Sequence, residues 1–325
     1  MMQIVLVGLG AGATAALLCA SIASGSVLAT FLLYLAPLPI MIAALGWSHW
    51  AGLVAALSAA AGLGSLLGFL FFAGFLLGMA LPAWWLAYLA LLARPSPGPP
   101  GTEWYPIGRI MLWAAALGAA VVTIAILQIG TDQESIHGAL RTGFEDIIRS
   151  QVPASAGGGI VLSPDERKRL LDVFVVLFPP AAAVSFLVIN SINLWLAGRI
   201  ALVSGRLPRP WPDVSAMTPP RVAPILLAAS AAGTFLPDVI GIVSGIFAAT
   251  LLMVHVMLGL AVIHAVTIGT KARVPILAGV YAGFAILSLR TSWASLALAA
   301  LGLAEALFGI RGRVAANRAP PSRRT

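Results

Sequence analysis

Six polar or ionisable residues stand within or at the ends of long apolar segments, where burying such groups in lipid is costly. They are Asn190, Asn193, Asp238, His255, His264 and Glu305. Amide, imidazole and carboxylate groups in such places bind a solute or hold helices together. Each of the six is therefore a candidate ligand-binding residue with a competing structural interpretation.

Glu305 lies within the apolar run 293–308, about one helical turn from the end of that run. Its carboxylate must find a partner or take up a proton. Arg311, six positions later, is too far round an ideal helix to pair with it, although an arginine from a nearby loop could reach it. Two interpretations stay open, a structural ion pair and a role in transport or ligand binding.

Asn190 and Asn193 are three residues apart and therefore share one helix face. Two amides on one face can bind a polar solute or join neighbouring helices. Asp238 follows Pro237 at the junction of two apolar segments, where it is either a functional carboxylate or a turn and helix-capping residue.

His255 and His264 belong to one apolar segment but are nine positions apart, so on a helix they point to opposite faces and cannot share a metal ion. His264 lies near the end of its segment, as a solvated or packing histidine would. The chain also has no HExxH, GxxxxGK[ST] or CxxC motif. We therefore predict no catalytic residue, no metal site, no cofactor and no ATP hydrolysis, and we expect the protein not to be an enzyme.

The amino-acid composition indicates whether water or lipid surrounds most of the chain. Hydrophobic residues make up 60% of the sequence and charged residues 9%, with a mean hydropathy of +1.00. No charged side chain occurs between Met1 and Ala93, which excludes a water-soluble fold. The net charge of +8 comes from arginines between apolar blocks and in the tail, not from a basic face with interleaved aromatics, so we expect no nucleic acid partner.

The predicted fold class is all-α, a polytopic transmembrane helix bundle of about ten spans, with eight to ten allowed. A span needs about 20 apolar residues. The basic segments fall on one side of such a bundle, which places both termini in the cytoplasm of a bacterial inner membrane. The expected spans are 4–24, 27–46, 50–67, 68–92, 109–130, 172–203, 222–236, 239–268, 274–289 and 291–309.

The chain divides into blocks by composition. Residues 1–93 form a four-span block, 94–108 a Pro/Gly linker that cannot be helical, 109–310 a second membrane block, and 311–325 an Arg-rich tail that we expect to be disordered. Within the second block, the polar segment 131–171 is expected outside the cytoplasm.

That polar segment contains apolar residues at helical spacing, which predicts an amphipathic helix lying on the membrane or packed against the bundle. Ser163 and Glu166 have the spacing of a capping box, so a helix should begin there. It should continue into the span 172–203 and be interrupted at Pro179-Pro180.

Several short motifs resemble those of the YybS-like family of bacterial multi-spanning membrane proteins. They are Gly259-Leu260-Ala261-Val262-Ile263-His264, Gly302-Leu303-Ala304-Glu305 with Phe308 and Arg311, Pro37-Leu38-Pro39 and Ala80-Leu81-Pro82. Glu305 stands where the family pattern has Asp. The resemblance implies a likeness to the substrate-capture subunits of energy-coupling-factor importers, and hence small-solute uptake, with Gly259, Gly302, Phe308 and Arg311 as family-motif positions.

Three functional hypotheses follow. The first is a transport-related protein, with the lipid bilayer and other membrane-protein subunits as partners. The alternative is a non-catalytic scaffold or assembly factor that uses residues 131–171 and the Arg-rich loops to hold partners. The least favoured is a lipid-modifying enzyme, which would need His255, Asp238 and another carboxylate within hydrogen-bond reach of one another.

Overall fold

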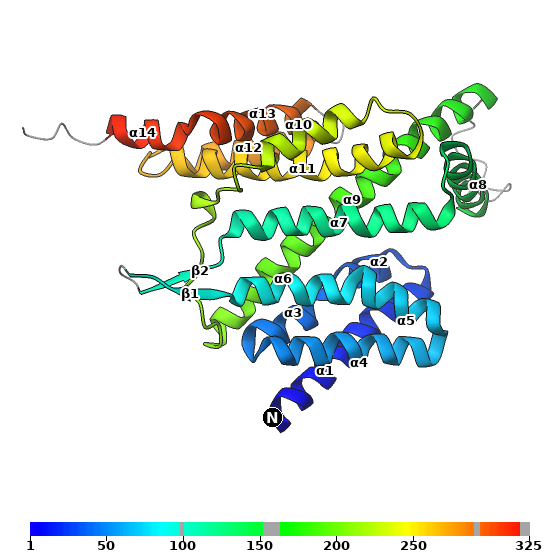
Figure 1. The fold of residues 1–325 in the computed structure, drawn as a ribbon, viewed down its shortest axis with the longest axis horizontal. Coiled ribbons are helices and arrows are strands. Elements are labelled where there is room, and N and C mark those ends of the chain that lie inside the picture. The colour runs from blue at the N-terminus through cyan, green and yellow to red at the C-terminus, as the bar shows by residue number, and fades with distance from the viewer. Residues whose placement is uncertain (98–100, 152–162, 289–292, 319–325) are drawn as a thin grey trace, which may run out of the picture.

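In the computed structural model, which describes residues 1–97, 101–151, 163–288 and 293–318, helices carry nearly the whole fold (Figure 1). Within these residues, seven helices or helix pairs are long and apolar enough to cross a membrane, and eight if a bent pair near the C-terminus is one span. The described surface is rich in large apolar side chains, such as Phe235 at 90% exposure and Leu66 at 82%. Lipid is the solvent such a surface requires, and the chain is a polytopic helical membrane protein.

The N-terminal block follows the expected spans closely, and its breaks have local causes. Pro37 interrupts the second span. Pro82 has no amide hydrogen to donate to the carbonyl oxygen one turn earlier, and a π-helical turn lies at this place. Gly68, at φ 93°, separates the third span from the fourth. The elements are α1 (Met2–Ala20), η1 (Ser21–Ser24), α2 (Val27–Tyr34), α3 (Pro37–Gly46), α4 (His49–Leu67), α5 (Phe69–Phe75), η2 (Leu76–Ala80) and α6 (Leu81–Leu91).

The linker after α6 is not helical, as predicted, but part of it is ordered as a hairpin. Strands β1 (Ala93–Pro95) and β2 (Thr102–Trp104) pair antiparallel, and Arg94 and Glu103 form a cross-strand ion pair at 2.7 Å. Helix α7 (Ile107–Ile129) then crosses the bundle in the expected place.

The predicted amphipathic helix is confirmed as α8 (Gln133–Gln151), and it packs against its neighbours rather than lying free. Ile136 is fully buried, and the Phe144 ring contacts those of Phe174 and Phe178 on the next helix. The part of the predicted polar segment at 152–162 lies outside the described residues.

Helix α9 (Pro164–Val203) begins with the predicted capping box, in which Ser163 and Glu166 bond to each other's backbone amides. The expected interruption at Pro179-Pro180 is wrong, because α9 continues through both prolines for 40 residues. Neighbouring helices hold the segment helical although the prolines remove two amide donors.

The C-terminal elements account for the difference between the expected ten spans and the seven or eight that are long enough. Helix α10 (Ala223–Gly233) has 11 residues and helix α12 (Arg273–Ser288) has 16 residues. Their lengths are roughly 16 Å and roughly 24 Å, which is less than the hydrocarbon thickness of about 30 Å. The other elements are η3 (Val214–Ala216), α11 (Asp238–Val266), α13 (Trp293–Phe308) and α14 (Ile310–Arg318). The tail was expected to be disordered from residue 311, but α14 extends to Arg318; residues 319–325 lie outside the description.

Contacts between distant segments define two ends of the bundle. At one end, called the basic end, Arg209 donates to the Ala90 carbonyl oxygen at 2.9 Å and lies over the Trp104 ring, and Arg311 reaches Ser215. The loops predicted to share one side therefore do meet there. The other end is called the α8 end, and it lies at the opposite side of the bundle (Figure 1).

Small residues fill the interior, so the helices approach one another closely. Between α11 and α13, an ideal Cβ on Gly259 would overlap the Leu298 carbonyl oxygen, and one on Gly302 would overlap that of His255. Gly8 and Gly12 likewise allow α1 to pack closely against α4. Gly259 and Gly302 thus form a helix crossing that only glycine permits.

Candidate functional site

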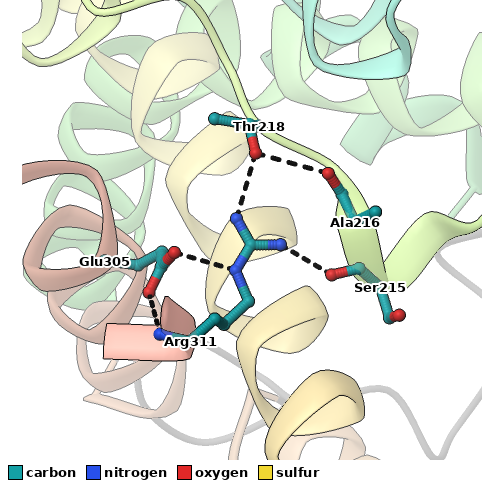
Figure 2. A network of polar contacts seen from close by, with 5 residues as sticks. All are labelled: Ser215, Ala216, Thr218, Glu305 and Arg311. Atoms are coloured by element: carbon teal, nitrogen blue, oxygen red, sulfur yellow. Dashed lines mark hydrogen bonds and ion pairs between the residues drawn. The ribbon is translucent and has the colours of Figure 1, made fainter. Parts of the chain in front are cut away.

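Glu305 pairs with Arg311, the residue that an ideal helix would keep out of reach (Figure 2). Arg311 Nε donates to Glu305 Oε1 at 2.8 Å, and its backbone amide donates to Oε2 at 2.9 Å. The pairing is possible because Gly309, at φ 62°, follows the end of α13, and α14 then leaves at an angle of 69°. A glycine in this conformation is a common helix terminator. The prediction that Arg311 lies too far round the helix from Glu305 holds only for one unbroken helix, and Gly309 breaks the helix between them.

The same guanidinium holds the loop that precedes α10. Arg311 Nη1 donates to the Ser215 carbonyl oxygen at 2.6 Å, and Nη2 donates to Thr218 Oγ1 at 3.1 Å. Thr218 in turn lies directly against Gly108 on α7, where a Cβ would overlap its carbonyl. We call Glu305, Arg311, Ser215 and Thr218 the basic-end latch. It ties α13 and α14 to the loop that leads into α10. Phe308, three residues before Arg311, is 59% exposed.

Asn190 and Asn193 are both buried on α9. Asn193 Nδ2 donates to the Tyr34 carbonyl oxygen at 2.8 Å, at the end of α2, and to Ile189 on its own helix. Asn190 Nδ2 donates only within α9, to Phe186. Asn193 therefore joins two helices that are distant in sequence, and the Oδ1 atoms of both amides lack a hydrogen-bond partner among the described residues.

Asp238 stands at the α8 end, at the first residue of α11, with φ 61°. Its Oδ1 accepts from the Gln133 backbone amide at 2.6 Å, so it caps α8 from another helix. Asp132 caps the same helix locally, because its Oδ1 accepts from the Ser135 amide at 2.8 Å. This backbone hydrogen bond, reinforced by one from the Ser135 hydroxyl, lowers the pKa of Asp132.

The two histidines of α11 do not meet. His255 is fully buried and its Nδ1 bonds to the Leu251 carbonyl oxygen, whereas His264 bonds through Nε2 to Tyr281 Oη at 2.9 Å. Asp238 lies about 25 Å from His255 along α11, so the enzyme-like cluster that they would need to form is not assembled. In the described residues no three His, Cys, Asp or Glu side chains are placed to hold a metal ion.

A cavity of about 510 Å³ opens between α7, α10 and α11 at the basic end. Tyr105 and Arg109 stand at its outer part, and its deeper walls are mostly apolar. We call it the basic-end cavity. The wall residues used below are Tyr105, Arg109, Ala116, Ser230, Phe247 and Thr250.

A second cavity, of about 340 Å³, lies toward the other end of the helix pair α10 and α11. It is lined by residues of α8, α9 and α11 and by the turn after α10, and Asp238 is its carboxylate. We call it the α8-end cavity. The wall residues used below are Val176, Pro180, Thr234, Asp238, Ile242 and Gly245.

A small buried apolar cluster adjoins the walls of both cavities. Ala119, Ala183 and Ile246 are fully buried together, and we call them the Ile246 layer. On α7, Ala119 comes three residues after Ala116, a wall residue of the basic-end cavity. On α9, Ala183 comes three residues after Pro180, a wall residue of the α8-end cavity.

On α11 the layer residue stands between the two walls, because Ile246 comes directly between Gly245 and Phe247. Gly118 allows α7 and α9 to close this layer, since an ideal Cβ there would be 2.9 Å from the Ala183 carbonyl oxygen. Along α10 and α11 the wall residues of the two cavities therefore come within about one helical turn of each other, next to the Ile246 layer.

Of the six candidates predicted from sequence, only Asp238 lines either of these cavities. No motif in the sequence indicates a binding role for Arg109, Tyr105 or Ile246, because their neighbours in the fold come from other helices. The chain matches no family model, no curated protein and no solved structure. By helix length and hydropathy it is a multi-pass membrane protein, and its resemblance to the YybS-like family stays a prediction.

Proposed function

We propose that the protein is a transport-related membrane protein without an ATPase of its own, which moves a small molecule between α7, α9, α10 and α11. The observation that carries this proposal is a pair of cavities, one toward each end of the bundle, whose wall residues approach each other along α10 and α11 beside the Ile246 layer. We propose that this layer separates them. A small rearrangement of that layer would connect one cavity to the other, as alternating access requires.

The proposal includes ten passes, two of them only partly helical. Thr218 bonds to Arg311 at the basic end and Asp238 bonds to Gln133 at the α8 end, so the chain between them crosses the bundle although α10 covers only part of the distance. Short helices with irregular backbone are typical of transporter binding regions, where the free backbone groups face a cavity. We further propose that the basic end faces the cytoplasm of a bacterial inner membrane, following the distribution of Arg and Lys.

The scaffold alternative has less support. Its expected docking element, α8, already has Phe144 packed against α9 and Arg141 paired with Asp172.

Two cysteine variants, made with Cys19→Ala, test the arrangement of the cavities. Ser230→Cys should react with a membrane-impermeant thiol reagent applied at the basic end, and Thr234→Cys with reagent applied at the α8 end. The two positions are only about 6 Å apart along α10. Reaction of both from the same end, or of neither from any, would contradict the proposal.

Removal of the layer side chain tests the pathway itself. In proteoliposomes loaded with carboxyfluorescein, Ile246→Ala should release the dye severalfold faster than the parent, because the two cavities become continuous. Ile240→Ala is the matched control, since Ile240 is 60% exposed on the same helix. Equal release from the two variants would count against a pathway through this layer.

A further inference from the structure

We propose that the basic-end cavity binds an anionic amphiphile, a molecule with a phosphate or carboxylate headgroup and an apolar body. This inference rests on the proposed function, because it names the class of molecule that the pathway accepts. Its basis is an arginine at the mouth of the cavity that has no anionic partner among the described residues.

Arg109 is the only charged residue among the wall residues of this cavity. Its side chain is exposed, and the described residues offer its guanidinium no ion pair or hydrogen bond. The one recorded contact is with the Tyr105 ring, whose centroid is 6.0 Å away. Two other arginines at this end have anionic partners, because Arg94 pairs with Glu103 and Arg311 pairs with Glu305.

Tyr105 supplies a second group for a headgroup. Its Oη accepts from Trp113 Nε1 at 3.2 Å. Its own hydroxyl hydrogen is therefore left to donate. The guanidinium and the phenol at this entrance are donors for which the described part of the chain offers no acceptor. They recognise a negatively charged oxygen group, and they disfavour a cation.

The depth of the cavity argues for an attached apolar chain. Its wall along α7 runs from Tyr105, just before the helix, to Ala116. That distance is about 16 Å, which is roughly half of the hydrocarbon thickness. Beyond Arg109 the wall is mostly apolar, with Phe247 at the inner end. A free anion would fill only the mouth, whereas an amphiphile from one leaflet places its headgroup at Arg109 and its chain against the deeper wall.

A set of probes with one chain and different headgroups tests this. Binding of radiolabelled dodecyl phosphate to the purified full-length protein in maltoside detergent should be saturable. It should be competed far more weakly by dodecylphosphocholine, by dodecyltrimethylammonium and by inorganic phosphate. Competition by inorganic phosphate equal to that of unlabelled dodecyl phosphate would overturn the amphiphile assignment, and equal competition by the choline compound would overturn the anionic one.

Arg109→Gln should weaken dodecyl phosphate binding about tenfold or more, because a charge-assisted hydrogen bond is lost. Tyr105→Phe should weaken it by a smaller factor. Arg313→Gln removes the same charge at the same end, on the exposed surface of α14, and should leave binding unchanged. Equal affinities of Arg109→Gln and Arg313→Gln would refute the inference.

The binding experiments and the dye-release experiment can each fail without the other. Selective anionic binding with no effect of Ile246→Ala on dye release would leave a lipid-binding site and remove the transport pathway. Accelerated release with no headgroup preference would leave the pathway and remove this ligand class. Thermal unfolding of Arg109→Gln should match the parent, because its guanidinium makes no hydrogen bond or ion pair with the described residues.

Discussion

Replacing Arg311 by methionine is expected to destabilise the protein more than any other single charge removal at the basic end. The side chains of Arg311 and Glu305 are 15% and 9% exposed, so water screens their interaction little. Arg311→Met removes the side-chain hydrogen bonds to Glu305, Ser215 and Thr218 and leaves a buried carboxylate with one backbone amide as donor.

The magnitude follows from what each variant leaves behind. Removing one partner of a buried ion pair costs about 3–5 kcal/mol, which is the expected loss for Arg311→Met. Glu305→Gln keeps an oxygen that can accept from Arg311, so it should cost about 1–2 kcal/mol, the difference between a charge-assisted and a neutral hydrogen bond. The double variant Glu305→Leu with Arg311→Met should cost less than the sum of its single changes, by about 0.5–3 kcal/mol.

The assay is reversible unfolding of the detergent-solubilised protein, followed by circular dichroism as a denaturing detergent is titrated. Arg313→Met is the matched control, because Arg313 is exposed on the same short helix. It should change the free energy of unfolding by about 0.5 kcal/mol or less. If Arg311→Met and Arg313→Met unfold within about 0.5 kcal/mol of each other, the latch does not hold these helices.

Two further predictions concern helix packing and helix capping. Gly302→Val should destabilise the protein by roughly 1–3 kcal/mol or more, because its side chain would overlap the His255 backbone. Gly62→Val, whose added Cβ would meet nothing within 4 Å, should not do so; the same unfolding titration compares the two, and equal stability would disprove the close crossing. The pKa of Asp132 is lowered in the folded protein, so its capping of α8 is present at neutral pH and is lost as pH falls through the carboxyl range. Exchange of the Ser135 amide, which donates to Asp132, should therefore show increased opening at acid pH, after correction for intrinsic exchange. This added pH dependence should be reduced in Asp132→Asn, in which Asp238 still caps α8 through the Gln133 amide; an undiminished dependence would contradict the assignment.

Local features of the fold were predictable because they depend on neighbours in sequence. The length of apolar runs located the long spans, and the spacing of Ser163 and Glu166 located the start of α9. The sequence also predicted that the Arg-rich loops share one end, because loops separated by an even number of spans lie on the same side of a membrane.

Features that depend on a single backbone conformation or on distant neighbours were not predictable. Gly309 adopts a left-handed conformation, and without that knowledge Arg311 seemed unable to meet Glu305. Pro179-Pro180 would break an isolated helix, but packing inside the bundle keeps α9 continuous. The walls around Arg109 come from three helices, and no pattern within one segment indicates which helices will be adjacent.

The length of α9 has a mechanical consequence for the whole protein. No charged residue lies between Asp172 and Arg199 in this helix. That stretch is about 40 Å long, beyond a hydrocarbon thickness of about 30 Å. A straight helix of that length fits by leaning, and Figure 1 shows α9 running obliquely past α7, with contacts to α3 and α6 as well as to α8 and α11.

A change in bilayer thickness alters the favoured lean of such a helix. Because α9 contacts elements of both halves of the molecule, hydrophobic mismatch would be felt in both. Lipid chain length thereby becomes a variable that acts on this protein without occupying any site.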